Sequence, residues 1–287
     1  MTNKISLSHR DIEPENGTLY LVGTPIGNLS DISKRALHIL NEVCFIACED
    51  TRLTKKIISS YKISNNLISF NQHNSFKKIP KMISDLKSGK SIALVSDAGM
   101  PGICDPGEQL VNSARLAGHD VVCIPGPCAA ITALVSSGLP SSKFVFEGFL
   151  PKKRVEREKI IFEISKNTRT TIIYESPHRL KKLLKELKKY CGGSRKIVIA
   201  RELTKKFEEH ITHNIDEVIK LFEDNDPKGE FTILLEGIES NSDITLDKIE
   251  LKKELHDLVS IGLSLSAASK YLAKKNNISK RSIYNLY

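Results

Sequence analysis

Three apolar runs in the first half of the chain each end in a turn that is rich in glycine and proline. The runs and the turns that follow them are 18–22 and 23–28, 92–95 and 96–107, and 121–124 and 125–130. Clusters of glycine and proline end both helices and strands. In an open α/β sheet, ligands bind at the edge where parallel strands end. One such turn would indicate only a tight connection, whereas three of them predict a small-molecule site.

The longest of these turns, residues 96–107, offers several ligand-binding groups. Its glycines allow the backbone to approach a ligand closely, and Asp97 and Asp105 supply carboxylates. These groups suit a ligand that has a positive centre, hydroxyl groups and a heterocycle. None of the three turns has the Gly-Lys-Ser/Thr ending of a phosphate-binding P-loop or the spacing G-x-G-x-x-G. The pattern therefore excludes those two kinds of nucleotide site.

The order of the apolar runs predicts an α/β fold. In the first half, strand-like runs alternate with amphipathic helices, which is typical of a mostly parallel sheet covered by helices. The second half adds strand-like runs at 144–147, 170–174, 196–200 and 231–236, and a helix at 181–190. The tail contains helices at 246–261 and 265–275 and a short third helix that Ser279 caps.

Shifts in composition divide the chain into four parts. We expect a disordered N-terminus over 1–16, an α/β domain over 17–140, a second α/β domain over 141–240 and a basic helical tail over 241–287. No apolar run is long enough to cross a bilayer, and the N-terminus lacks the apolar core of a secretory signal. The cysteines show no metal-ligand spacing, so we expect no metal site and a cytoplasmic location.

Eight short motifs, in a fixed order, carry a resemblance to a known family. They are GTPIGNL (23–29), EDTR (49–52), the turn 96–107, PGPCAAITA (125–133), EGFLP (147–151), YESPHR (174–179), ARELTK (200–205) and KGE (228–230). This series resembles the ribosomal RNA small subunit methyltransferase I family, which belongs to the tetrapyrrole-methylase superfamily of S-adenosylmethionine-dependent enzymes. The resemblance covers residues 17–240 and, more loosely, the tail.

The resemblance implies a fold, a cofactor and a substrate. It implies two α/β domains of the class III methyltransferase type with S-adenosylmethionine in the cleft between them. The implied cofactor contacts are Pro25, Ser96, Asp97, Ala98, Gly99, Pro101, Pro127, Cys128 and Ala129 from the first domain, and Tyr174, Glu175, Glu202, Thr204, Gly229 and Glu230 from the second. It also implies a homodimer that methylates a cytidine ribose 2′-hydroxyl in the decoding region of 16S rRNA, within the small ribosomal subunit.

A ribose hydroxyl is a weak nucleophile, so a general base beside it would assist the transfer. The catalytic candidates are Glu49, Arg52 and Asp97, because residues 49–52 follow a strand that ends at the same edge as the cofactor turns. Asp50 has an alternative role as the cap of the next helix. The base stays unassigned among Glu49, Asp50, Asp97, His178 and Glu202.

The net charge of +9 is concentrated in a few stretches. Residues 179–206 contain eleven Lys or Arg and two Glu, and residues 258–287 contain five Lys or Arg and no acid. Such stretches predict an RNA-facing surface, although each is also compatible with a solvated face, and the tail with a simple helical cap. The RNA-contact candidates are Lys152, Lys153, Arg154, Arg179, Arg201, Lys274, Lys275, Lys280 and Arg281.

Two other functions stay open on the sequence. One is methylation of a tetrapyrrole or another small molecule, which would not need the basic stretches or the helical tail. The other is a non-catalytic, RNA-binding assembly factor, against which the intact glycine and proline turns argue.

Overall fold

The computed structural model describes residues 13–223, 225–238, 243–276 and 279–287. Most of the N-terminal stretch for which disorder is predicted, 1–16, therefore lies outside the described residues. Within the described part of that stretch, the carboxylate of Glu13 accepts two hydrogen bonds of 2.7 Å from the guanidinium of Arg35.

The first lobe is built on a parallel sheet with the strand order β3-β2-β4-β1-β5. Its strands are β1 (Leu19–Val22), β2 (Phe45–Cys48), β3 (Leu67–Ser69), β4 (Ile92–Val95) and β5 (Val121–Ile124). The intervening helices are η1 (Leu29–Asp31), α1 (Lys34–Glu42), α2 (Thr51–Ser60), α3 (Ser75–Lys87) and α4 (Glu108–Leu116). The predicted parallel sheet is thus confirmed.

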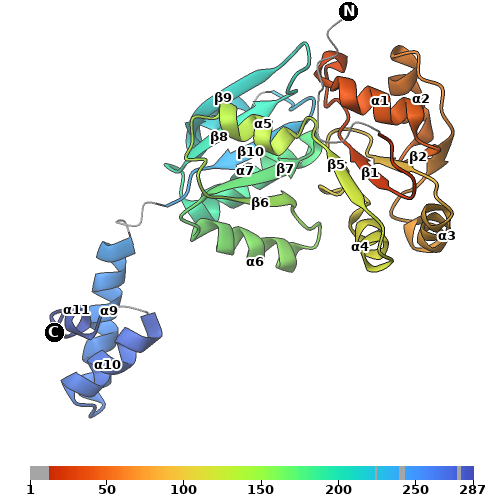
Figure 1. Ribbon diagram of the computed structural model, residues 1–287. Coiled ribbons are helices and arrows are strands. Elements are labelled where there is room, and N and C mark those ends of the chain that lie inside the picture. Colours follow the sequence, from red (N-terminus) through yellow and green to blue (C-terminus); the bar gives the residue numbers. More distant parts are fainter. Residues whose placement is uncertain (1–12, 224, 239–242, 277–278) are drawn as a thin grey trace, which may run out of the picture.

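Helices cover both faces of this sheet, which is why its strands consist mostly of apolar residues. Along β4, Ala93 and Val95 pack in one cluster with α1 and α2, whereas Ile92 and Leu94 pack in the other with α3 and α4. Side chains that alternate between two buried faces leave no polar positions in the strand. Figure 1 shows α1 and α2 on the side opposite to α3 and α4.

The second lobe is built on a mixed sheet with the order β6-β7-β10-β8-β9, in which only β6 and β7 are parallel. Its strands are β6 (Phe144–Phe149), β7 (Thr170–Glu175), β8 (Lys196–Arg201), β9 (Glu209–Asn214) and β10 (Phe231–Leu235). Its helices α6 (Arg154–Ser165), α7 (Pro177–Cys191) and α8 (Ile215–Leu221) pack on one face of the sheet. The two sheets with their helices confirm the predicted α/β class.

Helix α5 (Ala129–Ser136) connects the two lobes. It follows β5 of the first sheet, yet Ala130, Ala133 and Leu134 pack on the second sheet, on the face that α6–α8 leave open. The predicted boundary near residue 140 therefore comes after the chain has already crossed to the second lobe. This crossing places the N-terminus of α5 between the two lobes (Figure 1).

Strand β9 is not predicted by the sequence. Its residues, Glu209 to Asn214, are polar except for Ile211, and most of them are exposed because β9 is an edge strand of the second sheet. An edge strand that carries charged and polar side chains resists pairing with other chains. The same polarity removes the alternation of apolar residues by which strands are found.

The tail forms a separate helical unit of α9 (Asp243–Ser260), α10 (Leu265–Asn276) and α11 (Lys280–Tyr284). It has its own core, in which Leu255, Leu272 and Ile283 are fully buried. The predicted cap is confirmed, because the Ser279 hydroxyl accepts a hydrogen bond from the Ser282 amide at 3.1 Å. Figure 1 shows the unit apart from both lobes. Within the described residues, every helix is too short or too polar to span a membrane.

Candidate functional site

The three glycine and proline turns of the first lobe meet at the carboxyl ends of its strands. Thr24 and Gly99 exchange two backbone hydrogen bonds of 2.9 and 3.1 Å, which join the first turn to the second. Gly23 and Gly126 join the first turn to the third, because a Cβ atom added to Gly126 would lie only 2.7 Å from the Cα of Gly23. Glycine is required where two backbones approach this closely.

A cavity of about 330 Å³ lies between these turns and the second lobe. The first lobe and the start of α5 contribute Ile26, Ala98, Gly99, Met100, Ile103, Cys104, Asp105, Cys128 and Ala129. The second lobe contributes Phe149, Tyr174, Glu175, Ser176, Pro177, Glu230, Phe231 and Thr232. The walls are mostly apolar, with carboxylates on both sides, which is the usual composition of a small-molecule site.

Gly99 occupies a position in the first wall that other residues fit poorly. Its φ of +80° lies in the left-handed region, and an added Cβ would lie 3.2 Å from Ile26 Cγ2 and 3.3 Å from the Pro127 carbonyl oxygen. The turn is held from within by Ser96, whose hydroxyl donates to the carbonyls of Ala98 and Gly99. The backbone of this turn can therefore approach a ligand directly.

Tyr174 joins the two walls. It lies near the end of β7, and its hydroxyl accepts a hydrogen bond of 2.9 Å from the amide of Ala130 in the first turn of α5. The ring packs against Phe146 and Phe149 at centroid distances of 5.0 and 5.6 Å. Burial raises the pKa of the Tyr174 hydroxyl, and the nearby Cys128 thiol acts in the same direction. The phenol therefore stays neutral and serves as a polar contact between the lobes.

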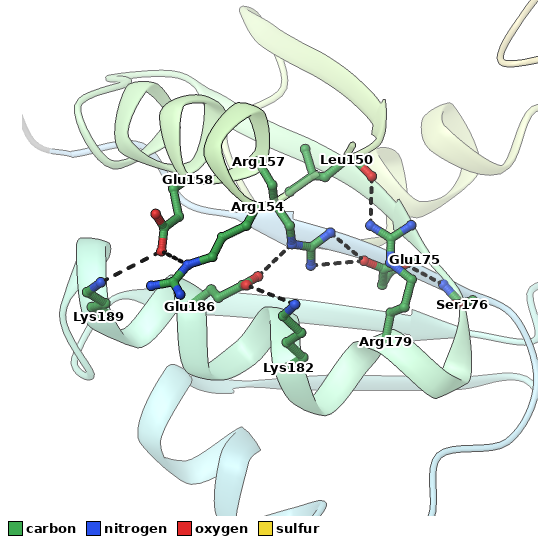
Figure 2. Close-up of polar contacts among 10 residues, drawn as sticks. All are labelled: Leu150, Arg154, Arg157, Glu158, Glu175, Ser176, Arg179, Lys182, Glu186 and Lys189. Carbon is green, nitrogen blue, oxygen red and sulfur yellow. Dashed lines mark hydrogen bonds and ion pairs between the residues drawn. The ribbon is translucent and has the colours of Figure 1, made fainter. Parts of the chain in front are cut away.

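Glu175 follows Tyr174 and is completely buried, although it borders the cavity. One carboxylate oxygen accepts two hydrogen bonds of 3.2 Å from Arg157, and the other accepts one of 2.9 Å from the Ser176 amide. Arg179, which the sequence indicates as a phosphate contact, forms an ion pair with Glu175 and donates to the Leu150 carbonyl at 2.6 Å. Figure 2 shows that its guanidinium points into this network.

Four of the residues implied for the second wall form one group. Glu202 accepts hydrogen bonds from Lys205 at 3.0 Å and from the Glu230 amide at 2.9 Å. Glu202 and Thr204 both have positive φ, and a Cβ on Gly229 would lie 2.6 Å from the Glu202 side chain. Of these four, Glu230 alone borders the cavity among the described residues. Glu202 contacts Glu230 through the Glu230 amide and so links this group to the wall.

An acidic rim, consisting of Glu49, Asp50, Asp97 and Asp105, adjoins the first wall, to which Asp105 itself belongs. The sequence expectation for Asp50 is confirmed, since it caps α2 and forms an ion pair with Arg52 that lowers the pKa of Asp50 to about 2. The Asp50 amide donates to Asp97 at 2.9 Å. Burial and the neighbouring carboxylates raise the pKa values of Glu49 and Asp105. The rim therefore concentrates negative charge at one side of the cleft.

The remaining predicted site residues do not border the cavity. Pro25, Asp97, Pro101 and Pro127 belong to the turns but not to the residues that border the cavity, and His178 lies next to Pro177 at the start of α7. Arg201 donates to the Lys228 carbonyl at 2.7 Å and pairs with Glu209 at the edge of the second sheet. Within the part of the chain that the structure describes, no cluster of three or more His, Cys, Asp or Glu residues is arranged to hold a metal ion.

The basic candidates other than Arg179 and Arg201 occupy two places. Lys152, Lys153 and Arg154 lie at the start of α6, where Lys153 pairs with Glu156 and Arg154 with Glu158. The tail carries the second group: Lys275 pairs with Glu254 of α9, and Lys280 donates to the Ser266 hydroxyl at 2.8 Å. Lys274 and Arg281 lie in α10 and α11 of the same unit.

Comparison with known proteins shows what this architecture is similar to. Residues 18–219 match the family model described as Tetrapyrrole (Corrin/Porphyrin) Methylases. The chain is 42% identical to ribosomal RNA small subunit methyltransferase I of Synechocystis over 94% of this chain and 97% of that protein. It is 44% identical to the Vibrio cholerae protein of the same name, over 93% and 92%.

A solved structure shares the fold at low sequence identity. This is the uroporphyrin-III C-methyltransferase from Thermus thermophilus in complex with S-adenosylhomocysteine, with a TM-score of 0.55 and 14% identity. The match covers 76% of this chain and 96% of that one. At this identity the match shows a shared fold and nothing more.

Substitution of Gly99 by Ala should weaken binding of S-adenosylhomocysteine and also lower stability. An alanine in the left-handed region costs about 1–2 kcal/mol, and its Cβ would press against the cavity wall. Gly89→Ala is the matched control, because Gly89 has a φ of +87° but open space around it. Calorimetry should show a weaker affinity in Gly99→Ala alone. Equal affinities in the two variants would contradict a ligand role for this turn.

Substitution of Glu49 by Gln should raise the melting temperature at neutral pH. Burial and the charges of Asp105, Asp97 and Asp50 raise the pKa of Glu49 in the folded protein, so its ionised form is less favourable there than in the unfolded chain. The gain should be below about 1 kcal/mol, since the side chain is only partly buried. It should disappear below about pH 4, where Glu49 is protonated in both states. A lower melting temperature at neutral pH would refute this assignment.

Proposed function

The chain belongs to the ribosomal RNA small subunit methyltransferase I family of tetrapyrrole methylases, and on this basis we propose that it methylates 16S rRNA with S-adenosylmethionine. We further propose that the acceptor is the ribose 2′-hydroxyl of a cytidine in the decoding region. The observation that carries the proposal is the two-walled cleft, which combines a glycine turn, apolar surfaces and carboxylates.

The residues that border the cleft fit S-adenosylmethionine chemically. This cofactor supplies a methyl group that is already activated on a positively charged sulfonium, so the protein needs mainly to bind and orient it. Ile26, Ile103 and Phe231 offer apolar surface for the adenine ring. Asp105 and Glu230, on opposite walls, would accept hydrogen bonds from hydroxyl or ammonium groups and attract the positive charge.

The acidic rim supports a role on the acceptor side. Glu49 has a raised pKa, which makes its carboxylate a stronger base than an ordinary glutamate. General bases work best when their pKa lies close to the working pH. Glu49 also lies near enough to Asp105, which borders the cavity, for the charge of Asp105 to act on it. On this position and on its raised pKa together, we assign proton removal from the ribose hydroxyl to Glu49. Asp97 holds the start of α2 through the Asp50 amide, and the exposed guanidinium of Arg52 is available to a phosphate.

Two basic surfaces support an RNA substrate. Five cationic side chains, of Arg154, Lys181, Lys182, Lys185 and Lys189, border a groove between α6 and α7 together with two glutamates. The tail unit adds the second surface. Lysine and arginine rows of this kind bind phosphates regardless of sequence. A tetrapyrrole substrate would require neither surface.

From an rRNA substrate we infer a cytoplasmic location, and from the family resemblance we infer a homodimer.

The direct test is methyl transfer from labelled S-adenosylmethionine. The protein is incubated with small ribosomal subunits that lack the modification, and separately with a porphyrinoid. We expect label only in 16S rRNA, at a nucleotide whose 3′ phosphodiester bond resists alkaline cleavage because its 2′-oxygen is methylated. Glu49→Gln should lower the rate by about 10²–10⁴-fold, the usual contribution of a general base. Label in the porphyrinoid, or in no substrate, would overturn the proposed function.

Replacement of Lys274, Lys275, Lys280 and Arg281 by Ala should weaken binding to the small subunit. For each phosphate that the variant no longer binds, the slope of log K against log salt should fall by roughly 0.7–0.9. Affinity for S-adenosylhomocysteine should not change, because the tail lies apart from the cleft. Lys77→Ala with Lys87→Ala, on α3, is the control. An unchanged salt slope together with a lower melting temperature would make the tail a structural cap.

A further inference from the structure

The charged side chain of Arg157 is enclosed by the second lobe, as is that of Glu175. Arg157 lies on α6 within a stretch of otherwise exposed charges, yet its side chain is only 2% exposed. A buried guanidinium is costly unless it is paired and hydrogen-bonded. None of the motifs that carry the family resemblance includes it, and the described residues that border the cavity do not include it either.

Arg157 connects three elements of the second lobe. Its Nη1 and Nη2 atoms both donate to one oxygen of Glu175 at 3.2 Å, at the end of β7. Its Nε atom donates to Glu186 of α7 at 2.6 Å. Figure 2 shows the guanidinium lying between these two carboxylates, beneath α6. The planar guanidinium can make all three contacts at once, which a lysine ammonium in its place could not reproduce.

Glu175 transmits this restraint to the cleft. Its second oxygen accepts the Ser176 amide at 2.9 Å and faces Arg179 at 3.2 Å. Ser176 and Pro177, which follow Glu175, border the cavity. Tyr174, which precedes Glu175, accepts a hydrogen bond from the N-terminus of α5. The orientation of the Glu175 carboxylate therefore fixes the wall formed by residues 174–177, including its contact with the other lobe.

We propose that Arg157 is a positioning residue for methyl transfer: it holds Glu175, and through Glu175 the wall 174–177, in the orientation that binds the cofactor. The inference rests on the proposed function. A purely stabilising role is the less suitable explanation, because well-packed apolar residues stabilise a protein as well as a buried ion pair or better. The ion pair between Arg157 and Glu175 instead lies at the wall 174–177, whose geometry the cofactor requires.

The test is a double-mutant cycle on cofactor affinity. Arg157→Met, Glu175→Gln and the double variant are compared with the wild type by calorimetry with S-adenosylhomocysteine, well below all melting temperatures. Arg157→Met should weaken binding by roughly tenfold, a typical effect of removing a residue that orients a binding group. The double variant should bind no more weakly than Glu175→Gln, because Arg157 acts through that carboxylate.

Two further variants keep the test decisive. Arg157→Lys retains the charge and should give an intermediate affinity, and Glu186→Ala removes the acceptor of the Nε contact if Arg157→Met does not fold. Arg35→Met is the control, because Arg35 makes a two-point pair with Glu13 in the first lobe and is not among the described residues that border the cavity. It should change the melting temperature at most.

Two results would overturn the inference. One is an affinity within twofold of the wild type in the folded Arg157 variants, with only the melting temperature lowered. The other is a double variant in which the two single effects multiply, which would show that Arg157 acts independently of Glu175. A wild-type protein that does not bind S-adenosylhomocysteine would instead refute the proposed function, and this inference with it.

Discussion

The hydrogen bond between the Tyr174 hydroxyl and the Ala130 amide is the contact on which the arrangement of the site depends. It joins the end of a strand in one sheet to the start of the helix that leaves the other sheet. Because α5 also packs its apolar side on the second sheet, the two lobes meet at a fixed place. The cleft is the space that remains between that contact and the glycine turns.

The two walls of the cleft contact the ligand in different ways, one through backbone and the other through side chains. The first wall brings backbone close to the ligand, and it relies on glycines at positions such as 23, 99 and 126, where a side chain would collide with neighbouring backbone or side chains. The second wall uses side chains, and it relies on a buried ion network to hold them. Removal of water from such a network strengthens its electrostatic interactions but makes every unpaired group costly.

The sequence predicts the first wall better than the second. Glycine and proline mark the turns, and apolar runs mark every strand except β9, whose polar residues lie at an exposed edge. Arg157 could not be found in this way. It lies among exposed lysines and glutamates, and the sequence pattern does not distinguish a buried charged residue from its exposed neighbours. Arg179 is the converse case: basic composition suggested a phosphate contact, whereas the structure pairs it with Glu175. Charge in a sequence does not reveal whether its partner is solvent or protein.

Amide hydrogen exchange with and without S-adenosylhomocysteine tests the central claim, that both lobes bind the cofactor at one cleft. We expect simultaneous protection of residues 98–105 and 128–130 in one wall and of 174–177 and 230–232 in the other. The tail helices should exchange at unchanged rates. Protection confined to one lobe, or found away from both walls, would contradict the two-walled site.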